Sequence, residues 1–574
     1  MDRTCAAWKL CYHKGKPGGC RAHKNADRKR VYETMRQKIR IFAAVAGCMA
    51  LLATGAQAAY SDIPESHWAY DVVNQSADLG VIQGRGDGTF GLGQQVTRAE
   101  FAAMLDRLMG WEMTAPAQAS YADVPASAWY YDAVETAKAH GAVTDTGVFR
   151  PDADITREEM AVWLVGALGY QDLAAQNEDL TIQFTDVTDN KGAIAMAYDF
   201  GIIEGKSRTS FAPDKPATRE EAAAMMMRLY DRAHSQTDWT HGFYAISSWS
   251  QHELGGQMDA VSLGWSRLEL QDGQAYLNTT NAGGNSWCVP DGYEDAVNYY
   301  KGTGTQMNLA VQMTDQAAAN AILPDAAQRT RAIEQLVQAA DDLGVDGVTV
   351  DFEGLKGDGL KNGLTAFVQE LKAALGGSRP VYVCVHPVLK NGGAYYDAYD
   401  YRALGEAVDK VILMAHDYAA SSMDQATADS GFTTTPVSPF EEVYYALHMA
   451  TDDQTGVRDT SKLVLGLSVS NTAGWTLQDG KVINLTANHP AMDTILRRMG
   501  QSDTRITYSD TYRNPYMTYT DDDGNTNILW YEDAQSLTDK IELARMFGVS
   551  QVSVWRLGAI PTDARWDLWS ALTE

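Results

Sequence analysis

After Arg232, short apolar runs of strand character alternate with amphipathic segments of helical period, and this alternation constrains the fold more than any other feature of the chain. The strand-like runs cover residues 242–247, 259–265, 307–313, 347–353, 381–386, 411–418, 463–470 and 551–557. Helical segments, such as 325–342 and 534–547, lie between them. Eight strands separated by helices predict a parallel (β/α)8 barrel, whose reacting groups gather at the C-terminal ends of the strands.

The octapeptide 346–353, which contains the fourth run, ends in two carboxylates. With a period of two, Thr349, Asp351 and Glu353 share one face of the strand, opposite a face of three apolar side chains. Burying ionisable groups costs free energy, so an acid pair at a strand end favours a catalytic site. The alternatives are a solvated strand edge and a buried acid that a basic partner neutralises.

This run, Asp-Gly-Val-Thr-Val-Asp-Phe-Glu, resembles the Asp-x-x-Asp-x-Asp-x-Glu signature of glycoside hydrolase family 18. That family contains chitinases and related N-acetylglucosaminidases of peptidoglycan and spore cortex, and it carries the signature on the fourth strand of its barrel. The resemblance implies that Glu353 is the proton donor, that Asp351 orients the substrate acetamide and that Asp346 is the leading Asp. Thr349 departs from the family pattern, because a hydroxyl stands where the family has a carboxylate. We expect Asp346 and Thr349 to lie on the substrate-binding side.

Two further strand ends extend the resemblance. Residues 414–418 look like the family's Met-x-Tyr-Asp element, with Asp417 matching the Asp and His416 standing where a Tyr is usual. Trp555 matches the eighth-strand Trp that forms the floor of the sugar subsite. Residues 264–268 on the second strand, which include Trp265, resemble the same segment in the cell-wall-lytic branch of the family. A single inward Trp or His belongs more often to a core, but their joint placement at strand ends favours a site.

The resemblance implies a retaining mechanism in which the substrate's own acetamide is the nucleophile, with no metal or organic cofactor. The expected substrate is a β-1,4-linked glycan containing N-acetylglucosamine, either peptidoglycan or chitin. Two other classes stay open: a non-catalytic glycan-binding protein, and a passive surface-layer protein whose barrel is a spacer.

The barrel region exceeds the ~250 residues typical of this fold, and the surplus lies mainly between the seventh and eighth strands. Aromatic segments 516–519 and 528–531 flank Asp523-Gly524 there, a pair that favours a hairpin turn. We expect an aromatic hairpin that could wall a sugar cleft. A calcium loop at residues 521–523 is the alternative, but the turn accounts for these acids more simply.

Three repeats spaced by about sixty residues precede the barrel. Each contains an Asp followed by an apolar residue, then a turn ending in Phe, then a Thr-Arg-x-Glu element that opens a helix. The three elements begin at Thr97, Thr156 and Thr218. A Thr cap with a Glu three positions later predicts a capping box, whatever the function of the repeat.

These repeats resemble S-layer homology domains, which hold exported proteins on secondary cell-wall polysaccharide in Gram-positive bacteria. The resemblance implies glycan-binding roles for Arg98, Arg157 and Arg219. It implies the same for the aromatic anchors Trp68 and Trp129 of the first two repeats. The third repeat has Asn190 and Lys191 in place of the Trp, so its groove is expected to be weaker.

Charge and hydropathy at the start of the chain predict export. The first 40 residues hold twelve Lys or Arg against three acids; taking these from the totals of 47 and 74 leaves 35 basic and 71 acidic residues. A body this acidic is a poor nucleic-acid binder. An apolar run over 41–58 ends in Ala-Gln-Ala, which predicts a signal peptide cleaved after Ala58, with lipidation at Cys48 as the minority alternative. Translation starting at Met35 would account for the odd basic stretch before it.

We therefore expect a protein on the cell wall or surface of a Gram-positive-type bacterium, without a transmembrane segment in its mature form. Cys288 and Cys384 lie beyond the leader and do not make a disulfide framework; Cys384 is expected to be a buried thiol. The predicted organisation is a leader over 1–58, repeats over 60–110, 120–170 and 183–231, a linker over 232–240 and a catalytic domain over 241–574.

Overall fold

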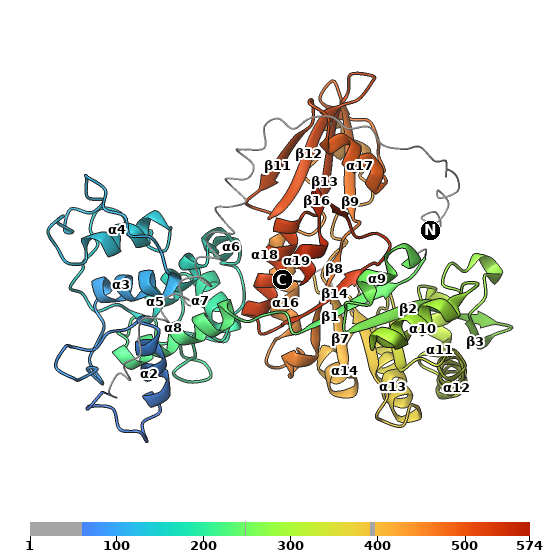
Figure 1. The fold of residues 1–574 in the computed structure, drawn as a ribbon, viewed down its shortest axis with the longest axis horizontal. Helices are drawn as coiled ribbons and strands as arrows, with labels where there is room; N and C mark the ends of the chain where they lie inside the picture. Colours follow the sequence, from blue (N-terminus) through green and yellow to red (C-terminus); the bar gives the residue numbers. More distant parts are fainter. Residues whose placement is uncertain (1–59, 247, 391–395, 574) are drawn as a thin grey trace.

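The computed structural model describes residues 60–246, 248–390 and 396–573 (Figure 1). A helical part ends with α8 at Ala233, and the barrel begins with β1 at Trp239. The predicted leader, its cleavage after Ala58 and the alternatives at Met35 and Cys48 lie outside the described residues. Within the described ranges, no helix combines the length and apolar character that crossing a membrane needs.

The predicted eight-stranded parallel barrel is confirmed. Its strands are β1 (Trp239–Tyr244), β2 (Ala260–Gln271), β4 (Gln306–Met313), β5 (Gly347–Phe352), β6 (Val381–Val385), β7 (Lys410–Met414), β8 (Leu463–Ser468) and β14 (Gln551–Trp555). They pair in the order β1-β14-β8-β7-β6-β5-β4-β2, and β1 also pairs with β2, which closes the barrel.

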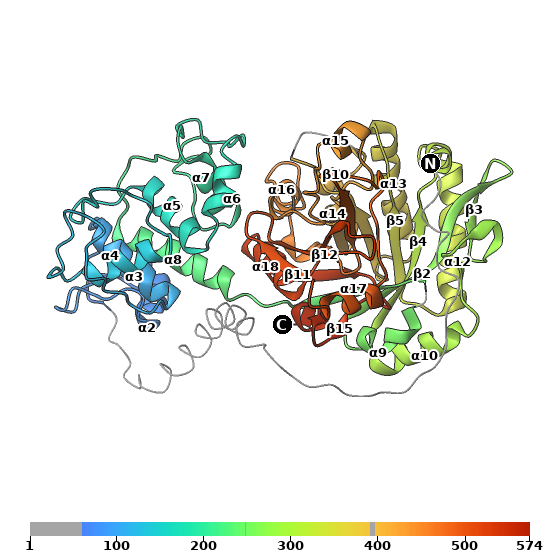
Figure 2. The same cartoon turned by 90° about the horizontal axis from the view of Figure 1, so that it is seen from above.

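Helices cover the outside of the barrel (Figures 1 and 2). They are α10 (Tyr293–Thr303), α11 (Gln316–Ile322), α12 (Ala326–Leu343), α13 (Asp358–Ala374), α14 (Tyr401–Ala407), α16 (Phe440–Ala450) and α18 (Ala534–Met546), with the short α9 (His252–Gly255) and α19 (Trp569–Thr573). The short α15 (Gln425–Asp429) packs instead against β10 (Lys481–Val482). β2 continues into a hairpin with β3 (Gln274–Asn278), which the strand pattern did not predict. Asp272 and Gly273 both have positive φ at this turn.

The interior of the barrel carries a layer of hydrogen-bonded polar side chains. His241 bridges Ser553 and Ser262, each at 2.7 Å, and the Ser262 hydroxyl lies 2.6 Å from that of Thr349. Asn308 donates to Thr349 at 3.2 Å. Burial lowers the pKa of His241 to about 3, so the ring is neutral and can act as donor and acceptor at once. These contacts satisfy the polar groups beneath the strand ends.

The predicted insertion is a five-stranded antiparallel sheet with one helix, α17 (Met492–Met499). The strands are β9 (Thr472–Gln478), β10 (Lys481–Val482), β11 (Arg505–Ser509), β12 (Asn514–Thr520) and β13 (Thr526–Tyr531). The aromatic hairpin is confirmed as β12 and β13, with Tyr516 opposite Trp530. Asp521 accepts hydrogen bonds from the backbone N–H groups of Asp523 and Asn525, as expected of a turn. Across the described residues, no three His, Cys, Asp or Glu side chains are grouped to hold a metal.

The helical part is a closed ring of three units. Its helices are α2 (Tyr70–Asp78), α3 (Arg98–Met109), α4 (Tyr131–Ala139), α5 (Arg157–Ala167), α6 (Gln171–Gln176), α7 (Lys191–Asp199) and α8 (Arg219–Ala233). The capping boxes at Thr97, Thr156 and Thr218 are confirmed. α3 packs on α4, α5 on α7 and α8 on α2, so the second helix of each repeat packs on the first helix of the next repeat around the ring.

The helical part docks on the barrel through its third repeat and through residues 169–176, which precede that repeat (Figures 1 and 2). Asp199 of α7 accepts hydrogen bonds from Tyr444 at 2.7 Å and from His448 at 2.9 Å, both on α16. Phe200 contacts Phe547 edge to face, with 5.3 Å between the ring centroids. One continuous hydrophobic core runs from the helical part into the helical layer of the barrel.

Candidate active site

The acid pair lies at the C-terminal end of β5, the end at which β/α barrels place their reacting groups. Asp351 is 4% exposed inside the barrel, and Glu353 follows β5 directly with a half-buried side chain. The Glu353 N–H donates to the Met313 carbonyl at 2.9 Å, which fixes the backbone beyond the strand. On the other face of β5, Phe352 packs on Phe367 of α13 with 5.1 Å between the rings.

Thr349 and Asp346 lie further down the same strand. Thr349 is fully buried in the polar layer one step below Asp351. Asp346 precedes β5, and its carboxylate accepts a hydrogen bond from the Met307 N–H at 2.8 Å. Five residues of strand correspond to about 16 Å, so the structure does not bring Asp346 to the site. The expectation that Asp346 binds substrate is therefore corrected: it joins two strands at the opposite end of the barrel.

The environment of Glu353 favours its protonated form. Burial and the negative charges of Asp351 and Asp417 raise the pKa of the Glu353 carboxyl, and His416 opposes this in part. Burial also raises the pKa of Asp351, against a hydrogen bond from the Cys384 thiol. Asp351 and Glu353 lie two residues apart on one face of the strand and influence each other's protonation, so the pair holds a proton at neutral pH. Such a pair can act as a general acid.

His416 and Asp417 follow β7 and form an ion pair, with 2.8 Å between Nδ1 and Oδ2. Burial lowers the pKa of His416, but the charge of Asp417 outweighs it and leaves the pKa above its usual value. Burial raises the pKa of Asp417, and His416 reverses this and holds it below its usual value. Asp417 has φ of 64° and a side chain that is 57% exposed, so its carboxylate reaches solvent above the barrel.

Aromatic side chains surround the end of β14. The Trp555 ring stacks on Trp287 with 5.9 Å between centroids and an interplanar angle of 16°, and it meets Phe243 edge to face. Trp555 is half-buried, as a stacking surface requires. Trp265 is only 2% exposed and packs between Tyr244 and Tyr293 in the helical layer. The predicted substrate-binding role of Trp265 is corrected, because its side chain faces away from the barrel interior.

Three residues at the strand ends were not among the predicted site residues. His386 follows β6 and accepts a hydrogen bond from the Gly354 N–H at 3.3 Å. Burial lowers the pKa of His386 to about 4, so this ring is neutral. The Tyr399 hydroxyl donates to the Phe352 carbonyl at 2.7 Å, and Trp287 belongs to a loop after β3. His386 ends a predicted strand and could have been found; Trp287 and Tyr399 lie in loops that carried no such signal.

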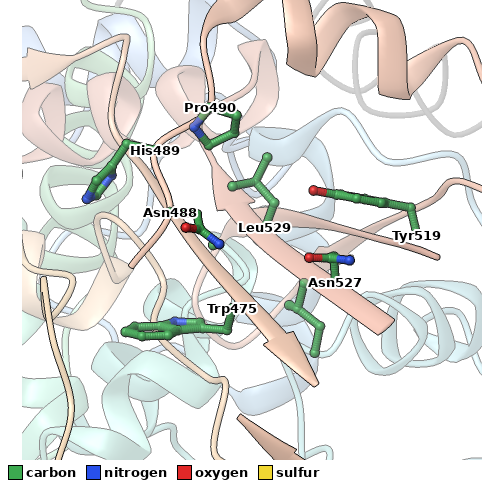
Figure 3. A pocket seen from close by; sticks show the side chains of 9 residues that line it. Trp475, Asn488, His489, Pro490, Tyr519, Asn527 and Leu529 are labelled. Atoms are coloured by element: carbon green, nitrogen blue, oxygen red, sulfur yellow. The ribbon is translucent and has the colours of Figure 1, made fainter. Parts of the chain in front are cut away.

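The inserted sheet encloses a cavity of about 320 Å³ (Figure 3). His489 on its rim hydrogen-bonds the Thr472 carbonyl through Nδ1 at 2.6 Å, and the charge of His489 helps to lower the pKa of Asp417. The lining of the cavity consists of Gly474, Trp475, Asn488, His489, Pro490, Tyr519, Asn527, Ile528 and Leu529.

The sequence matches two families. The model of glycosyl hydrolases family 18 matches residues 312–559, and that of the S-layer homology domain matches residues 59–102, 120–161 and 183–223. The chain carries a family 18 glycosyl hydrolase domain and three S-layer homology domains.

Relatives of each part were found. The exoglucanase XynX of Acetivibrio thermocellus is 33% identical over 184 residues, which cover 31% of this chain and 16% of that protein. The cortical fragment-lytic enzyme of Bacillus subtilis (strain 168) is 25% identical over 255 residues, covering 44% and 55%. The crystal structure of the Bacillus cereus spore cortex-lytic enzyme SleL aligns with a TM-score of 0.47 and 17% identity, covering 66% of this chain and 82% of that one. The chain spans about half of one curated relative and about a sixth of the other.

The arginines of the S-layer homology repeats are buried between the repeats. Arg98, Arg157 and Arg219 are 1 to 3% exposed, and each donates through Nε to the carbonyl of a Phe in the next repeat around the ring. The guanidinium groups lie over the rings of the same Phe residues. Trp68 and Trp129, in contrast, are 61% and 67% exposed. The arginines thus connect neighbouring repeats, and the tryptophans project into solvent.

The three arginine positions differ in their charge balance. Arg98 contacts two carboxylates, Asp145 at 2.8 Å and Glu159, and Arg150 also contacts Glu159. Arg157 instead donates to the backbone carbonyl of Glu204. In the same way, Arg219 donates to the backbone carbonyl of Gln83, and its nearest carboxylate, that of Glu100, is 3.7 Å away and already paired with Arg85. Arg98 and Arg150 thus face two carboxylates, those of Asp145 and Glu159, whereas Arg219 and Arg85 face only the carboxylate of Glu100.

The loop of the second repeat explains this difference. This loop runs over nine residues, from Gly141 to Phe149, whereas the loops of the first and third repeats run over eleven, 80–90 and 201–211. Gly84 and Gly205 occupy the place of Asp145 in those longer loops. A Cβ on Gly84 would lie 2.4 Å from Tyr60, and one on Gly205 would lie 2.4 Å from a carbonyl oxygen. Only the shorter loop leaves room for a side chain, and there the side chain is an acid.

Proposed function

We propose that the chain is a glycoside hydrolase that cleaves β-1,4 bonds in glycans containing N-acetylglucosamine, in peptidoglycan or chitin. The observation that carries the proposal is the Glu353 carboxyl, held protonated by burial and by Asp351 at the C-terminal end of β5. A carboxyl that keeps its proton at neutral pH is what protonation of a glycosidic oxygen requires. The family 18 domain supports the same reaction class.

In the proposed mechanism, Glu353 protonates the glycosidic oxygen while the acetamide oxygen of the substrate attacks its own anomeric carbon. Asp351 lies beside Glu353 and would stabilise the acetamide as it becomes an oxazolinium ion. His416 and Asp417 would hydrogen-bond the acetamide region, and Trp555 would stack beneath the sugar ring. Water then opens the oxazolinium from the face that the leaving group has left, with Glu353 acting as the base.

The cavity of the inserted sheet supports a longer binding surface. Tyr519 offers an aromatic face and Asn488 an amide group, which is the mixture of groups that binds sugars. The sheet is held to the loop after β7, because Trp475 donates to the Thr435 hydroxyl at 2.7 Å and Trp530 to the Thr433 carbonyl at 2.8 Å. A glycan occupying the barrel mouth could extend into this cavity.

The test uses the full-length chain with fully N-acetylated and de-N-acetylated oligomers, and follows product anomers by NMR. We expect cleavage of the acetylated oligomer only, with retention of configuration. Cleavage of both oligomers at similar rates, or an inverted product, would rule out the substrate-assisted mechanism. Binding without cleavage of any acetylated glycan would favour the alternative, a non-catalytic glycan-binding protein, to which the departures at Thr349 and His416 give some support.

We also propose that the S-layer homology repeats hold the protein on secondary cell-wall polysaccharide at the surface of a Gram-positive-type bacterium. The exposed Trp68 and Trp129 offer stacking surfaces. The Glu221 carboxylate near Arg157 already pairs with Lys206, and the Glu100 carboxylate near Arg219 pairs with Arg85, so both positions offer uncompensated positive charge. Arg98 is neutralised by its two carboxylates, so it should contribute less to an anionic glycan site. This reverses the expectation that the third repeat supplies the weakest groove, because Arg219 faces the first repeat.

Retention on walls tests this anchoring role. The full-length chain should pellet with walls that keep their polysaccharide and stay in solution with walls stripped of it. Asp145→Gly restores the glycine of the other two loops and should strengthen retention, whereas Arg157→Ala should weaken it. Equal pelleting with stripped walls would show that another wall component is the ligand.

A further inference from the structure

The departure at Thr349 leaves open what holds Asp351 in place. The Thr349 hydroxyl lies within hydrogen-bond distance of Ser262 and Asn308 on β2 and β4, in the polar layer of the barrel. A hydroxyl in this network cannot supply the charge that a carboxylate would supply next to Asp351. The group that restrains Asp351 must therefore come from another strand.

Cys384 on β6 occupies the place beside Asp351. Thr349 pairs in register with Tyr382, and Val350 pairs with Val383, so Asp351 and Cys384 are the next neighbours along the two parallel strands. Cys384 is 1% exposed and belongs to the apolar cluster inside the barrel. The register therefore places the buried Cys384 thiol against the Asp351 carboxyl, where it favours the ionised form of Asp351.

One oxygen of the Asp351 carboxylate, Oδ1, is buried and has no hydrogen-bond partner within the part of the chain that the structure describes. A buried carboxylate oxygen without a partner costs free energy, which a ligand donating to it would recover. A thiol is a weak donor that packs like a small apolar group, so it can hold one end of the carboxylate without adding a charge.

We infer that Cys384 is a positioning residue, whose thiol holds the Asp351 carboxylate by one end and leaves its free oxygen for the substrate acetamide. This inference rests on the proposed function. The restraint keeps Asp351 in the orientation that the oxazolinium ion needs, and it favours the ionised form of Asp351 while Glu353 keeps the proton. Cys384 itself touches no reacting atom.

The test compares Cys384→Ala and Cys384→Ser in the full-length chain by the pH profile of kcat on an N-acetylglucosamine oligomer. Without the thiol, Asp351 takes up a proton more easily, so the acidic limb of the Ala variant should move up by about one pH unit. At a pH on the acidic limb, that shift lowers kcat about tenfold relative to the unmodified chain. The Ser variant keeps a donor, and its limb should stay at or below that of the unmodified chain. KM should change by less than about threefold, a bound set by the lack of substrate contact.

Val464→Ala is the matched control for packing. Val464 lies in the same interior cluster on β8, is fully buried, and leaves a cavity of similar kind when truncated. We expect no movement of its acidic limb. A limb that moves equally in Val464→Ala, or a Cys384→Ala profile that superimposes on that of the unmodified chain, would overturn the inference.

Infrared spectroscopy of the thiol separates this inference from the proposed function. The difference spectrum between the unmodified chain and Cys384→Ala isolates the S–H stretch of Cys384. That band should shift as Asp351 titrates, and the shift should vanish in Asp351→Asn. A band insensitive to pH overturns the inference even if the chain is active. A pH-sensitive band in a chain that cleaves no acetylated glycan overturns the proposed function, and the positioning role with it.

Discussion

Arg513 joins the helical part of the molecule to the barrel, and its replacement gives a sharp test of the docked arrangement. The guanidinium lies 4.9 Å from the ring centroid of Tyr170, in the helical part, and 4.4 Å from that of Phe440 on α16. Its Nη2 donates to the Gly169 carbonyl at 2.8 Å. On the barrel side, Nη1 is 3.8 Å from Asp539, and the Arg513 side chain is 19% exposed.

The expected cost of Arg513→Ala follows from these contacts. Two cation–π contacts at a partly desolvated site are worth about 0.5 to 1 kcal/mol each. A hydrogen bond from a charged donor is worth about 1.5 kcal/mol or more. The docked state should therefore lose about 3 kcal/mol, which corresponds to roughly a hundredfold in the docking equilibrium.

Hydrogen–deuterium exchange measured by mass spectrometry reads this equilibrium on both sides of the contact. In Arg513→Ala, peptides covering α6 and α16 should exchange roughly a hundredfold faster, while peptides from β5 and β6 keep their protection. Arg505→Ala is the control, because Arg505 lies exposed on β11 of the same sheet. Unchanged exchange in α6 and α16, or an equal acceleration in Arg505→Ala, would refute the reasoning.

Four further predictions test the site, the interface and the anchor. Glu353→Gln should lower kcat by about a thousandfold with glycan affinity in calorimetry nearly unchanged, because the amide keeps the shape but gives no proton; a kcat within tenfold would contradict the acid role. The pH profile of kcat should fall on its alkaline side at a pH above the usual carboxyl range, because burial and neighbouring charge raise the pKa of Glu353; a fall near pH 4 to 5 would contradict it. Burial lowers the pKa of His448, but the charge of Asp199 raises it, and the net change is a rise. The stability that the His448–Asp199 pair gives the interface is therefore complete below the pKa of His448 in the unfolded chain and is lost as the pH rises through its pKa in the folded chain. Asp199→Asn should remove this pH dependence from the melting temperature. In wall pelleting, Arg157→Ala should lose more protein than Arg98→Ala, and equal losses would contradict the difference in charge balance.

The barrel was predictable because its strands follow a local rule. Each strand alternates between an interior side and a helix-facing side, and that alternation is visible in a single run of residues. β5 shows this directly, since the predicted run 347–353 ends one residue beyond the observed strand. The capping boxes of the repeats were predictable for the same reason, because a Thr and a Glu three positions apart make both contacts locally.

The errors came from choices that the sequence leaves open. Alternation on β2 separates Trp265 from Ser262 but does not say which side faces the barrel; the structure places Ser262 inside and Trp265 under the helices. A family motif likewise does not say that its first residue lies at the far end of the strand, where Asp346 is found. Trp287 reaches Trp555 only through the folding of the β2–β3 hairpin and the loop after it, which is a long-range contact that no local pattern encodes.

The ring of repeats shows the same limit at a larger scale. Sequence similarity divides this part into three consecutive units, but each arginine completes a contact with the following unit, and Arg219 closes the ring onto the first. The arginine contacts are therefore shared between repeats. The aromatic anchor of one repeat and the arginine of another must be considered together when binding is assigned.

The polar atoms inside the barrel differ in whether other side chains satisfy them. Below the strand ends, His241, Ser262 and Thr349 satisfy one another. At the strand ends, Oδ1 of Asp351 and Oγ of Ser468 are buried without a hydrogen-bond partner among the residues described. Each such atom costs about 1 to 3 kcal/mol. A sugar acetamide and hydroxyls placed against these atoms would recover that free energy, so the same atoms that weaken the empty barrel would strengthen its complex with a glycan.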